Sequence, residues 1–261
     1  MAKPKTARPI SANAAIEAKF SKELQELCAE FEHSVYYWTR AAYNKNPPKM
    51  ESLVAQDASA VSTLNKVFKE LGKRWISKFD DMAVQIATRY MSDTFKSADN
   101  AFMQSLIDAG FAVEFKPSAV VKEALKASIA ESVSLIKSIP AEHLKNIEGL
   151  AMRSVMAGRD LKMFNDELKE KYGATTKRAR LIALNQCNRA TATVRQARSL
   201  EAGITHGIWL HSHSGKTPRA SHLAFDRKEF DLREGAYLDG EWVQPGEAIN
   251  CRCSYRPILP I

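Results

Sequence analysis

Residues 175–203 have the sequence TTKRARLIALNQCNRATATVRQARSLEAG, and this stretch predicts one long helix that Gly203 closes. Small and apolar side chains recur along it at steps of three and four residues, which places them on one face of the helix. A seam of small side chains lets another element approach closely. Its members are Ala179, Ala183, Cys187, Ala190, Val194 and Ala197.

The pattern changes after this helix. Residues 204–261 hold the short runs THGIWLHS, AYLDGEWVQ and CRCSYRPIL among glycine, proline, aspartate and serine. Short runs bounded by turn residues are typical of strands. The tail is therefore predicted to be a small β-containing subdomain packed on the last helix.

Upstream of the long helix, the pattern is mostly helical. Apolar residues at steps of three or four predict helices over 11–43 and 54–108, the second with a candidate break at Gly72 and an end at Gly110. The alternating run FAVEF at 111–115 predicts a short strand.

The middle of the chain continues this helical pattern. A further helix is expected from the N-cap candidate Ser118 to Pro140, which is predicted to end it. One or two more helices are expected over 141–172, with Gly173 as their end. The predicted fold class is therefore α+β, with a predominantly helical N-terminal two-thirds and a small β-containing C-terminal subdomain.

Composition narrows the class of protein without naming its function. The chain has 261 residues, 45% of them hydrophobic, which excludes wholesale disorder, and its formal net charge of +8 suits contact with polyanions. Four cysteines are too few for a disulfide scaffold, so a reducing compartment is expected, with Cys28 and Cys187 packed in the core. Neither a secretory signal nor a membrane span is expected from the apolar pattern.

The helix at 175–203 carries six basic residues against one acidic residue, Glu201. One interpretation is a surface that binds double-stranded DNA without sequence specificity, because arginine and lysine release counterions from phosphates. The alternative is a solvated face whose cations pair with acidic residues elsewhere in the fold. The residues predicted to bind DNA are Arg178, Arg189, Arg195 and Arg198, together with the basic N-terminal residues Lys3, Lys5 and Arg8.

Histidine and cysteine are concentrated in the tail, in HSHSGKTPRASH at 211–222 and NCRC at 250–253. Thiolate and imidazole are preferred zinc ligands, and a C-x-C pair on a strand directs both sulfurs to one face. The candidate ligands of a structural zinc ion are His222, Cys251 and Cys253, with His211 or His213 as the fourth. The alternative is that the cysteines pack as small hydrophobic residues and the histidines lie in surface loops.

No residue is predicted to be catalytic. His211 or His213 could pair with Asp226 or Asp231 as a base and its orienting acid. However, the chain has no nucleophile elbow, no H-E-x-x-H motif and no phosphate-binding glycine loop. A zinc-dependent hydrolase or nuclease, or an effector enzyme that uses the His/Cys-rich tail, therefore stands as the alternative class of function.

The tail contains an ordered series of residues: Trp209, Pro218-Arg219, His222, Asp226, Phe230, Gly240, Pro245-Gly246 and Asn250-Cys251-Arg252-Cys253. This series resembles the C-terminal signature of the tailed-phage head morphogenesis family, the Mu F-like minor head proteins. Upstream helical segments are also similar, so the resemblance covers about residues 115–256. The chain departs from many relatives at Arg227, where they carry glycine, and at Leu184-Asn185, where they often carry an acid.

The resemblance implies a minor structural component of a bacteriophage head. Such a protein associates with the portal protein and other head or scaffold proteins during procapsid assembly, and contacts packaged or ejected DNA. It implies a virion location after synthesis in the host cytoplasm, and no enzymatic activity. The domains expected on this basis are a flexible basic arm at 1–10, a helical domain at 11–110 and a Mu F-like domain at 111–261, helical to about residue 203.

Overall fold

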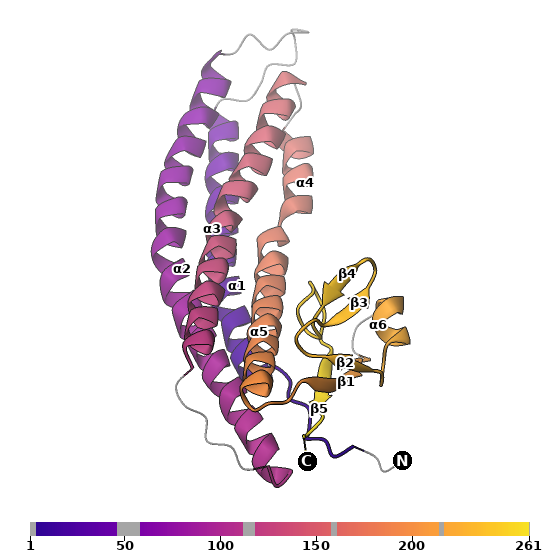
Figure 1. Ribbon diagram of the computed structural model, residues 1–261. Coiled ribbons are helices and arrows are strands. Elements are labelled where there is room, and N and C mark those ends of the chain that lie inside the picture. The colour runs from indigo at the N-terminus through magenta and orange to yellow at the C-terminus, as the bar shows by residue number, and fades with distance from the viewer. Residues whose placement is uncertain (1–3, 46–57, 112–117, 158–160, 214–216, 261) are drawn as a thin grey trace. The chain divides into compact units, whose positions relative to one another are not determined.

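The computed structural model describes residues 4–45, 58–111, 118–157, 161–213 and 217–260 of the chain. The predicted α+β fold class is confirmed, and all strands among the described residues lie in the C-terminal part (Figure 1). The helices are α1 (Ala14–Lys45), α2 (Ala58–Asp108), α3 (Ala119–Met156), α4 (Leu161–Lys171), α5 (Ala174–Glu201) and α6 (Ala220–Ala224). The strands are β1 (His206–Leu210), β2 (Glu229–Asp231), β3 (Ala236–Leu238), β4 (Glu241–Val243) and β5 (Ser254–Pro257).

Glycine ends the helices where the sequence predicts. Gly110, Gly173 and Gly203 follow α2, α4 and α5, with φ of 71°, 83° and 75°. Glycine adopts this left-handed conformation without the steric penalty that a Cβ brings, so it lets the last carbonyls find partners. After α5, for example, the amide of Ile204 donates to the carbonyl of Ser199 at 2.8 Å.

Two predicted interruptions are wrong. Helix α3 runs through Pro140, and α2 continues through Gly72. Pro140 is buried between the buried residues Ile139 and Leu144, so the packing of an apolar face outweighs the backbone hydrogen bond that proline removes. Apart from Phe111, the strand predicted at 111–115 lies outside the described residues.

The chain divides into two compact units, each assembled from separate segments. The sheet-containing unit comprises Met1–Phe20, Ala87–Glu131 and Ala183–Ile261, and the helical unit comprises Ser21–Ile86 and Ser132–Ile182. This division differs from the boundary predicted near residue 110. The sequence could not indicate it, because both division points of α1 and α2 fall inside continuous helices, where the pattern does not change.

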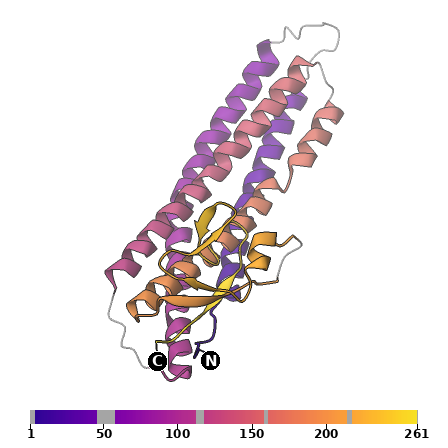
Figure 2. The ribbon, with the colours of Figure 1, turned by 45° about the vertical axis from the view of Figure 1, so that its right-hand side comes forward.

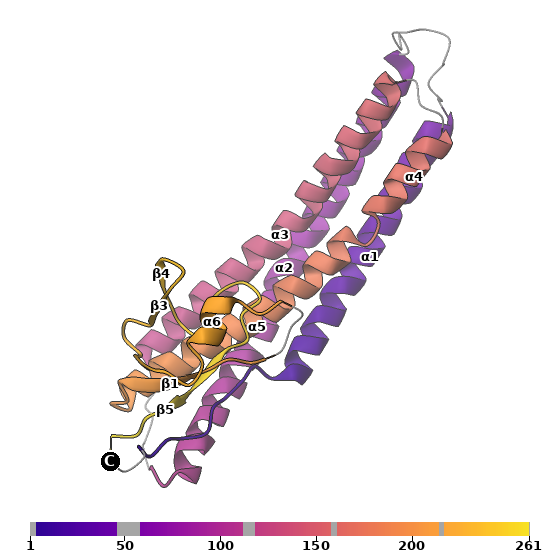
Figure 3. The ribbon, with the colours of Figure 1, turned by 90° about the vertical axis from the view of Figure 1, so that its right-hand side faces the viewer.

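The helical unit is built around aromatic side chains. Phe31 of α1 packs against Trp75 and Phe79 of α2, with ring centroids 5.4 and 5.6 Å apart. Tyr43 of α1 stacks on Phe164 of α4 at 4.5 Å, which holds these two helices side by side (Figure 3). None of the described helices is long and apolar enough to cross a membrane.

The sheet-containing unit holds a three-stranded antiparallel sheet in the order β2-β1-β5 and a separate hairpin of β3 and β4. The sheet packs on α5 (Figure 2), as the sequence predicts. Tyr255 of β5 shares a buried hydrogen bond with Ser199 of α5, at 2.8 Å between their hydroxyl oxygens. Gln196 of α5 also donates to the carbonyl of Leu232, at 2.7 Å.

The first described residues are not a free arm. Thr6 forms an antiparallel bridge with Ile258, and the amide of Ala7 donates to the carbonyl of Pro257 at 3.1 Å. Ala7 and Ile10 are buried, so apolar contact and backbone pairing hold this segment. The prediction of a flexible arm at residues 1–10 therefore fails over the residues that the structure describes, and Lys3 lies outside them.

Candidate metal centre

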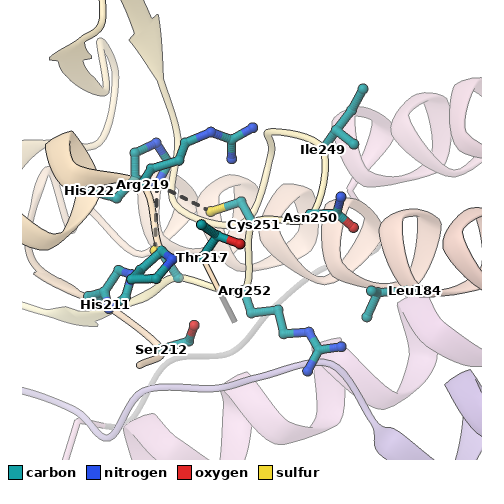
Figure 4. A pocket seen from close by; sticks show the side chains of 12 residues that line it. Leu184, His211, Ser212, Thr217, Arg219, His222, Ile249, Asn250, Cys251 and Arg252 are labelled. Carbon is teal, nitrogen blue, oxygen red and sulfur yellow. Dashed lines mark hydrogen bonds between the residues drawn. The ribbon is translucent and has the colours of Figure 1, made fainter. Parts of the chain in front are cut away.

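His222, Cys251 and Cys253 meet at one point in the sheet-containing unit. The Nδ1 atom of His222 lies 3.6 Å from the Sγ atom of Cys251 and 3.7 Å from that of Cys253 (Figure 4). The three potential ligand atoms lie within 4.8 Å of one another, and the three side chains are buried. The structure thus brings together three of the five residues that the sequence singled out as metal ligands.

The loop that carries Cys251 is held by backbone features on both sides. Gly246 has a φ of 96°, and a Cβ there would lie 3.2 Å from the carbonyl oxygen of Cys253, so any other residue would be strained. Asn250 takes a left-handed φ of 59°, which asparagine tolerates better than most residues. The backbone amide of Asn250 donates to the side-chain oxygen of Asn185 on α5, at 2.8 Å.

His222 is positioned by the short helix α6 and by the sheet. Its ring meets the buried Trp209 of β1 edge-on, with centroids 5.4 Å apart and an interplanar angle of 89°. Trp209 also packs edge-on against Phe225 and Phe230. These aromatic contacts fix the plane of the imidazole, so its Nδ1 atom faces the two sulfurs.

The two thiols differ in acidity because they share a hydrogen bond. The Cys253 thiol donates to Cys251, and backbone hydrogen bonds from Cys253 and Gly246 add to this, which lowers the pKa of Cys251 in spite of burial. The same side-chain hydrogen bond and burial raise the pKa of Cys253. The environment therefore favours a thiolate at Cys251.

The predicted fourth ligand is not in the cluster. The Nδ1 atom of His211 accepts the backbone amide of His213 at 3.1 Å, so this nitrogen is already engaged. His213 is 63% exposed, and its Nε2 atom lies 3.5 Å from Asp226. His211 and His213 therefore lie near the cluster without joining it.

The base–acid pairs considered from the sequence are only partly formed. His213 and Asp226 contact each other at the surface, while one Asp226 oxygen also accepts the backbone amide of His211 at 2.7 Å. Asp231 instead pairs with Arg233, which lowers the pKa of Asp231 to about 2. These contacts support the loop after β1 and assign no catalytic pair.

A cavity of about 440 Å³ lies beside the cluster. His222, Cys251 and Cys253 form part of its wall, as does His211 (Figure 4). The exposed side chains of Arg219 and Arg252 also line it, so the cavity combines soft metal-binding atoms with two cations.

The arginines predicted to bind DNA all have partners inside the protein. In the helical unit, Arg178 forms an ion pair with Glu142 and donates to Ser138 at 2.8 Å. In the sheet-containing unit, Arg189 forms an ion pair with Glu131. Both agree with the alternative interpretation, in which the cations of this helix pair with acidic residues of the fold.

The prediction is wrong for the other two arginines of this set. Arg195 and Arg198 are only 2% and 6% exposed. Arg198 donates to Asp99 at 2.7 Å and to Glu201 at 2.8 Å. A buried guanidinium cannot release counterions from DNA. The spacing was present in the sequence, because Arg198 lies four residues after the buried Val194 and Arg195 lies four residues after the buried Thr191.

Arg195 is a structural residue that the sequence analysis placed on the surface. It donates to the carbonyl of Ile10 at 3.0 Å, to the hydroxyl of Ser254 at 2.6 Å and to the carbonyl of Pro245 at 2.6 Å. Its guanidinium also lies 4.4 Å from the centroid of the Tyr255 ring. One side chain therefore joins the N-terminal segment, the loop before the cysteines and β5.

The other two cysteines occupy the positions predicted for them. Cys28 and Cys187 are fully buried, and burial raises the pKa of each thiol to about 12. They are core residues, since a thiol this weakly acidic has little thiolate to react or to bind metal.

Comparison with known proteins identifies the region around this cluster. Residues 145–256 match the family described as Phage Mu protein F like protein, which confirms the resemblance over a range that begins at 145 rather than near 115. A protein of Haemophilus influenzae named only as uncharacterized is 31% identical over 139 residues. The aligned part is 53% of this chain and 30% of that protein, so the chain spans less than a third of its relative. No solved structure matches the chain.

Proposed function

From the match of residues 145–256 to the Mu F-like family, we propose that the protein is a minor structural component of a bacteriophage head. In this role it acts in assembly at the portal vertex and procapsid and becomes part of the virion. Its partners are the portal protein and other head or scaffold proteins. The family match is the observation that carries this proposal.

The surface of the sheet-containing unit suits contact with other proteins. Tyr237 and Trp242 lie opposite each other on the β3–β4 hairpin and are 60% and 59% exposed, with ring centroids 5.4 Å apart. Exposed aromatic side chains are enriched at protein interfaces. The hairpin is therefore the surface that we assign to a head-protein partner.

Contact with DNA through α5 has little support, since Arg195 and Arg198 are buried and Arg178 and Arg189 pair with glutamates. Any contact with packaged or ejected DNA would have to use other cations. The proposed role therefore depends on contacts with other head proteins rather than on contacts with DNA through α5.

Co-expression with the portal and major head proteins of the same phage tests the role. The protein is expected to co-sediment with procapsids, and the double variant Tyr237→Ser/Trp242→Ser is expected to lose this association while remaining folded. Trp38→Ser, which changes an exposed tryptophan of the helical unit, is the matched control. The proposal would be refuted if heads assembled equally well without the protein and if heads made in its presence did not contain it.

The alternative function, a zinc-dependent hydrolase or nuclease, has one observation in its favour: the cavity beside the His/Cys cluster. Purified protein is expected to leave plasmid DNA and model ester or peptide substrates uncleaved. Metal-dependent turnover that Cys253→Ser abolishes would replace the structural role with an enzymatic one.

A further inference from the structure

We propose that Cys251, Cys253 and His222 bind one zinc ion whose fourth coordination position opens on the adjacent cavity. The site would join α6 to the segment before β5. It is independent of the role proposed in phage assembly, because it follows from the ligand atoms alone.

The spacing of the three ligand atoms matches tetrahedral zinc. With zinc–sulfur bonds of about 2.3 Å and zinc–nitrogen bonds of about 2.05 Å, the tetrahedral angle sets a sulfur–nitrogen separation of about 3.6 Å. The observed separations from His222 Nδ1 are 3.6 Å to Cys251 Sγ and 3.7 Å to Cys253 Sγ.

A hydrogen bond alone explains this geometry poorly. One imidazole nitrogen offers a single lone pair or a single proton, so it can serve one sulfur well but not two. The nearly equal distances from Nδ1 to both sulfurs are those of three ligands arranged around a common centre. Two thiolates and one imidazole are also the soft donor set that favours zinc over magnesium or calcium.

The surroundings of the sulfurs support a metal–thiolate site. Backbone hydrogen bonds reach Cys251 from Cys253 and Gly246, and one reaches Cys253 from Ser212. Donors of this kind orient thiolate ligands and offset their charge in zinc sites. The indole N–H of Trp209 is buried with no other hydrogen-bond partner among the described residues, and a metal-bound Cys253 thiolate would accept it.

The cavity leaves room for a fourth ligand that none of the described residues supplies. His211, one of the two histidines expected from the sequence as the fourth ligand, lies outside the cluster with its Nδ1 atom engaged by a backbone amide. All three cluster residues line the cavity, and so do the exposed Arg219 and Arg252. The fourth ligand is therefore water or a small anion, which these cations would favour.

A bound ion would cross-link a part of the chain that is built from short helices and strands. Strands β2, β3 and β4 have three residues each, and α6 has five. Metal binding to the folded form adds its binding free energy to the free energy of unfolding.

Metal analysis of the full chain, purified under reducing conditions without a histidine tag, tests the site. One zinc per chain is expected, and a chelator should lower the melting temperature. Cys253→Ser and His222→Asn should each lose the zinc, and the chelator should then have no effect. Cys187→Ala removes a buried thiol outside the cluster and should keep one zinc per chain. The site is overturned if the purified protein contains no zinc and its melting temperature changes with neither added zinc nor chelator, whether the thiols are free or joined as a disulfide.

Cobalt(II) in place of zinc tests the fourth position. The expected result is the visible spectrum of tetrahedral cobalt with thiolate ligands, changed saturably by added thiocyanate and unchanged by His211→Ala. A spectrum that does not respond to thiocyanate overturns the open position, and one that His211→Ala alters assigns His211 as the fourth ligand. If the cysteine variants do not fold, the zinc content and the cobalt spectrum of the unaltered chain decide the question.

Discussion

The side chain of Glu32 on α1 accepts the backbone amide of Thr175, with 2.8 Å between Oε1 and the amide nitrogen. Its second oxygen accepts the amide of Gly173 at the same distance. These amides lie at the N-terminus of α5, where backbone N–H groups have no partner within the helix and the helix dipole favours negative charge. Glu32 is 2% exposed, so it caps α5 from inside the helical unit.

Replacing this cap is expected to be costly. Glu32→Ala should lower the free energy of unfolding by ~2–3 kcal/mol, because a buried amide loses its acceptor. Denaturant titration followed by circular dichroism measures the change. Glu26→Ala, on the same helix but 67% exposed and paired with Lys22 alone among the described residues, should change it by less than ~0.5 kcal/mol. Equal losses in the two variants would contradict the capping role.

Arg195→Ala is expected to destabilise the protein rather than weaken DNA binding. Its loss leaves the carbonyl of Pro245 and the hydroxyl of Ser254 without the donated hydrogen bond, while the carbonyl of Ile10 keeps only Ser254 as a donor, and together these losses should cost ~3 kcal/mol or more. Arg195→Lys keeps the positive charge but loses the planar guanidinium and its several N–H donors, so this variant should also be less stable. Thermal melts and DNA retention at low salt are the measurements. A fully stable Arg195→Ala protein with reduced DNA retention would restore the surface interpretation.

Arg227→Gly is expected to stabilise the protein. Arg227 adopts a left-handed φ of 63°, and its side chain is 86% exposed with one weak pair, to Asp226 at 3.7 Å. Glycine removes a steric cost of ~1–2 kcal/mol and adds backbone entropy to the unfolded chain, for a net gain of ~0.5–1 kcal/mol. Lys228, the next residue, does not have a left-handed φ, so Lys228→Gly should instead lower stability. A gain in both variants would show that φ is not the cause.

Gly72→Ala is also expected to stabilise the protein. Gly72 lies inside α2, and a Cβ built there meets nothing within 4 Å. Alanine favours the helix over glycine by ~0.5–1 kcal/mol, mainly through the entropy of the unfolded chain. The midpoint of urea unfolding should rise with an unchanged slope. A lower midpoint would mean that the open space seen beside Gly72 is filled.

Acidification is expected to weaken the helical unit through His143. Burial lowers the pKa of His143, and nearby Glu32 only partly opposes this. Below the unfolded value of about 6.5, the unfolded chain binds more protons than the folded one, so stability falls as pH drops from about 7.5 to 5.5. His143→Gln should flatten this slope. Unfolding free energies at several pH values measure it, and parallel slopes in the two proteins would exclude His143 as the cause.

The parts of the fold that depend on local pattern could be predicted from the sequence. The long helix ending at Gly203 is one, because periodicity and the terminal glycine are both local. Pro140 shows the limit of such reasoning: its local effect is to end a helix, yet burial among Ile139 and Leu144 keeps α3 continuous. Tertiary packing decides such cases, and a single sequence does not display it.

The candidate site was predictable to the same extent. Residue types and the C-x-C spacing indicated Cys251, Cys253 and His222, but they could not show that His211 and His213 stay outside the cluster. The orientation of His222 depends on α6 and on the ring of Trp209, which only the fold places beside the cysteines. Likewise, the support of Asn185 for the Asn250 backbone joins residues 65 positions apart.

The pairing of Thr6 with Ile258 has a consequence for synthesis on the ribosome. The chain is made from its N-terminus, so at roughly 5–20 residues per second Ile258 is added roughly 10–50 s after Thr6. The helical unit, whose last segment ends at Ile182, can fold while translation continues. Ala7 and Ile10, which are buried in the folded protein, must wait for Pro257 and Ile258 to emerge, so the sheet-containing unit completes its folding after the helical unit can and is the part most in need of protection from aggregation.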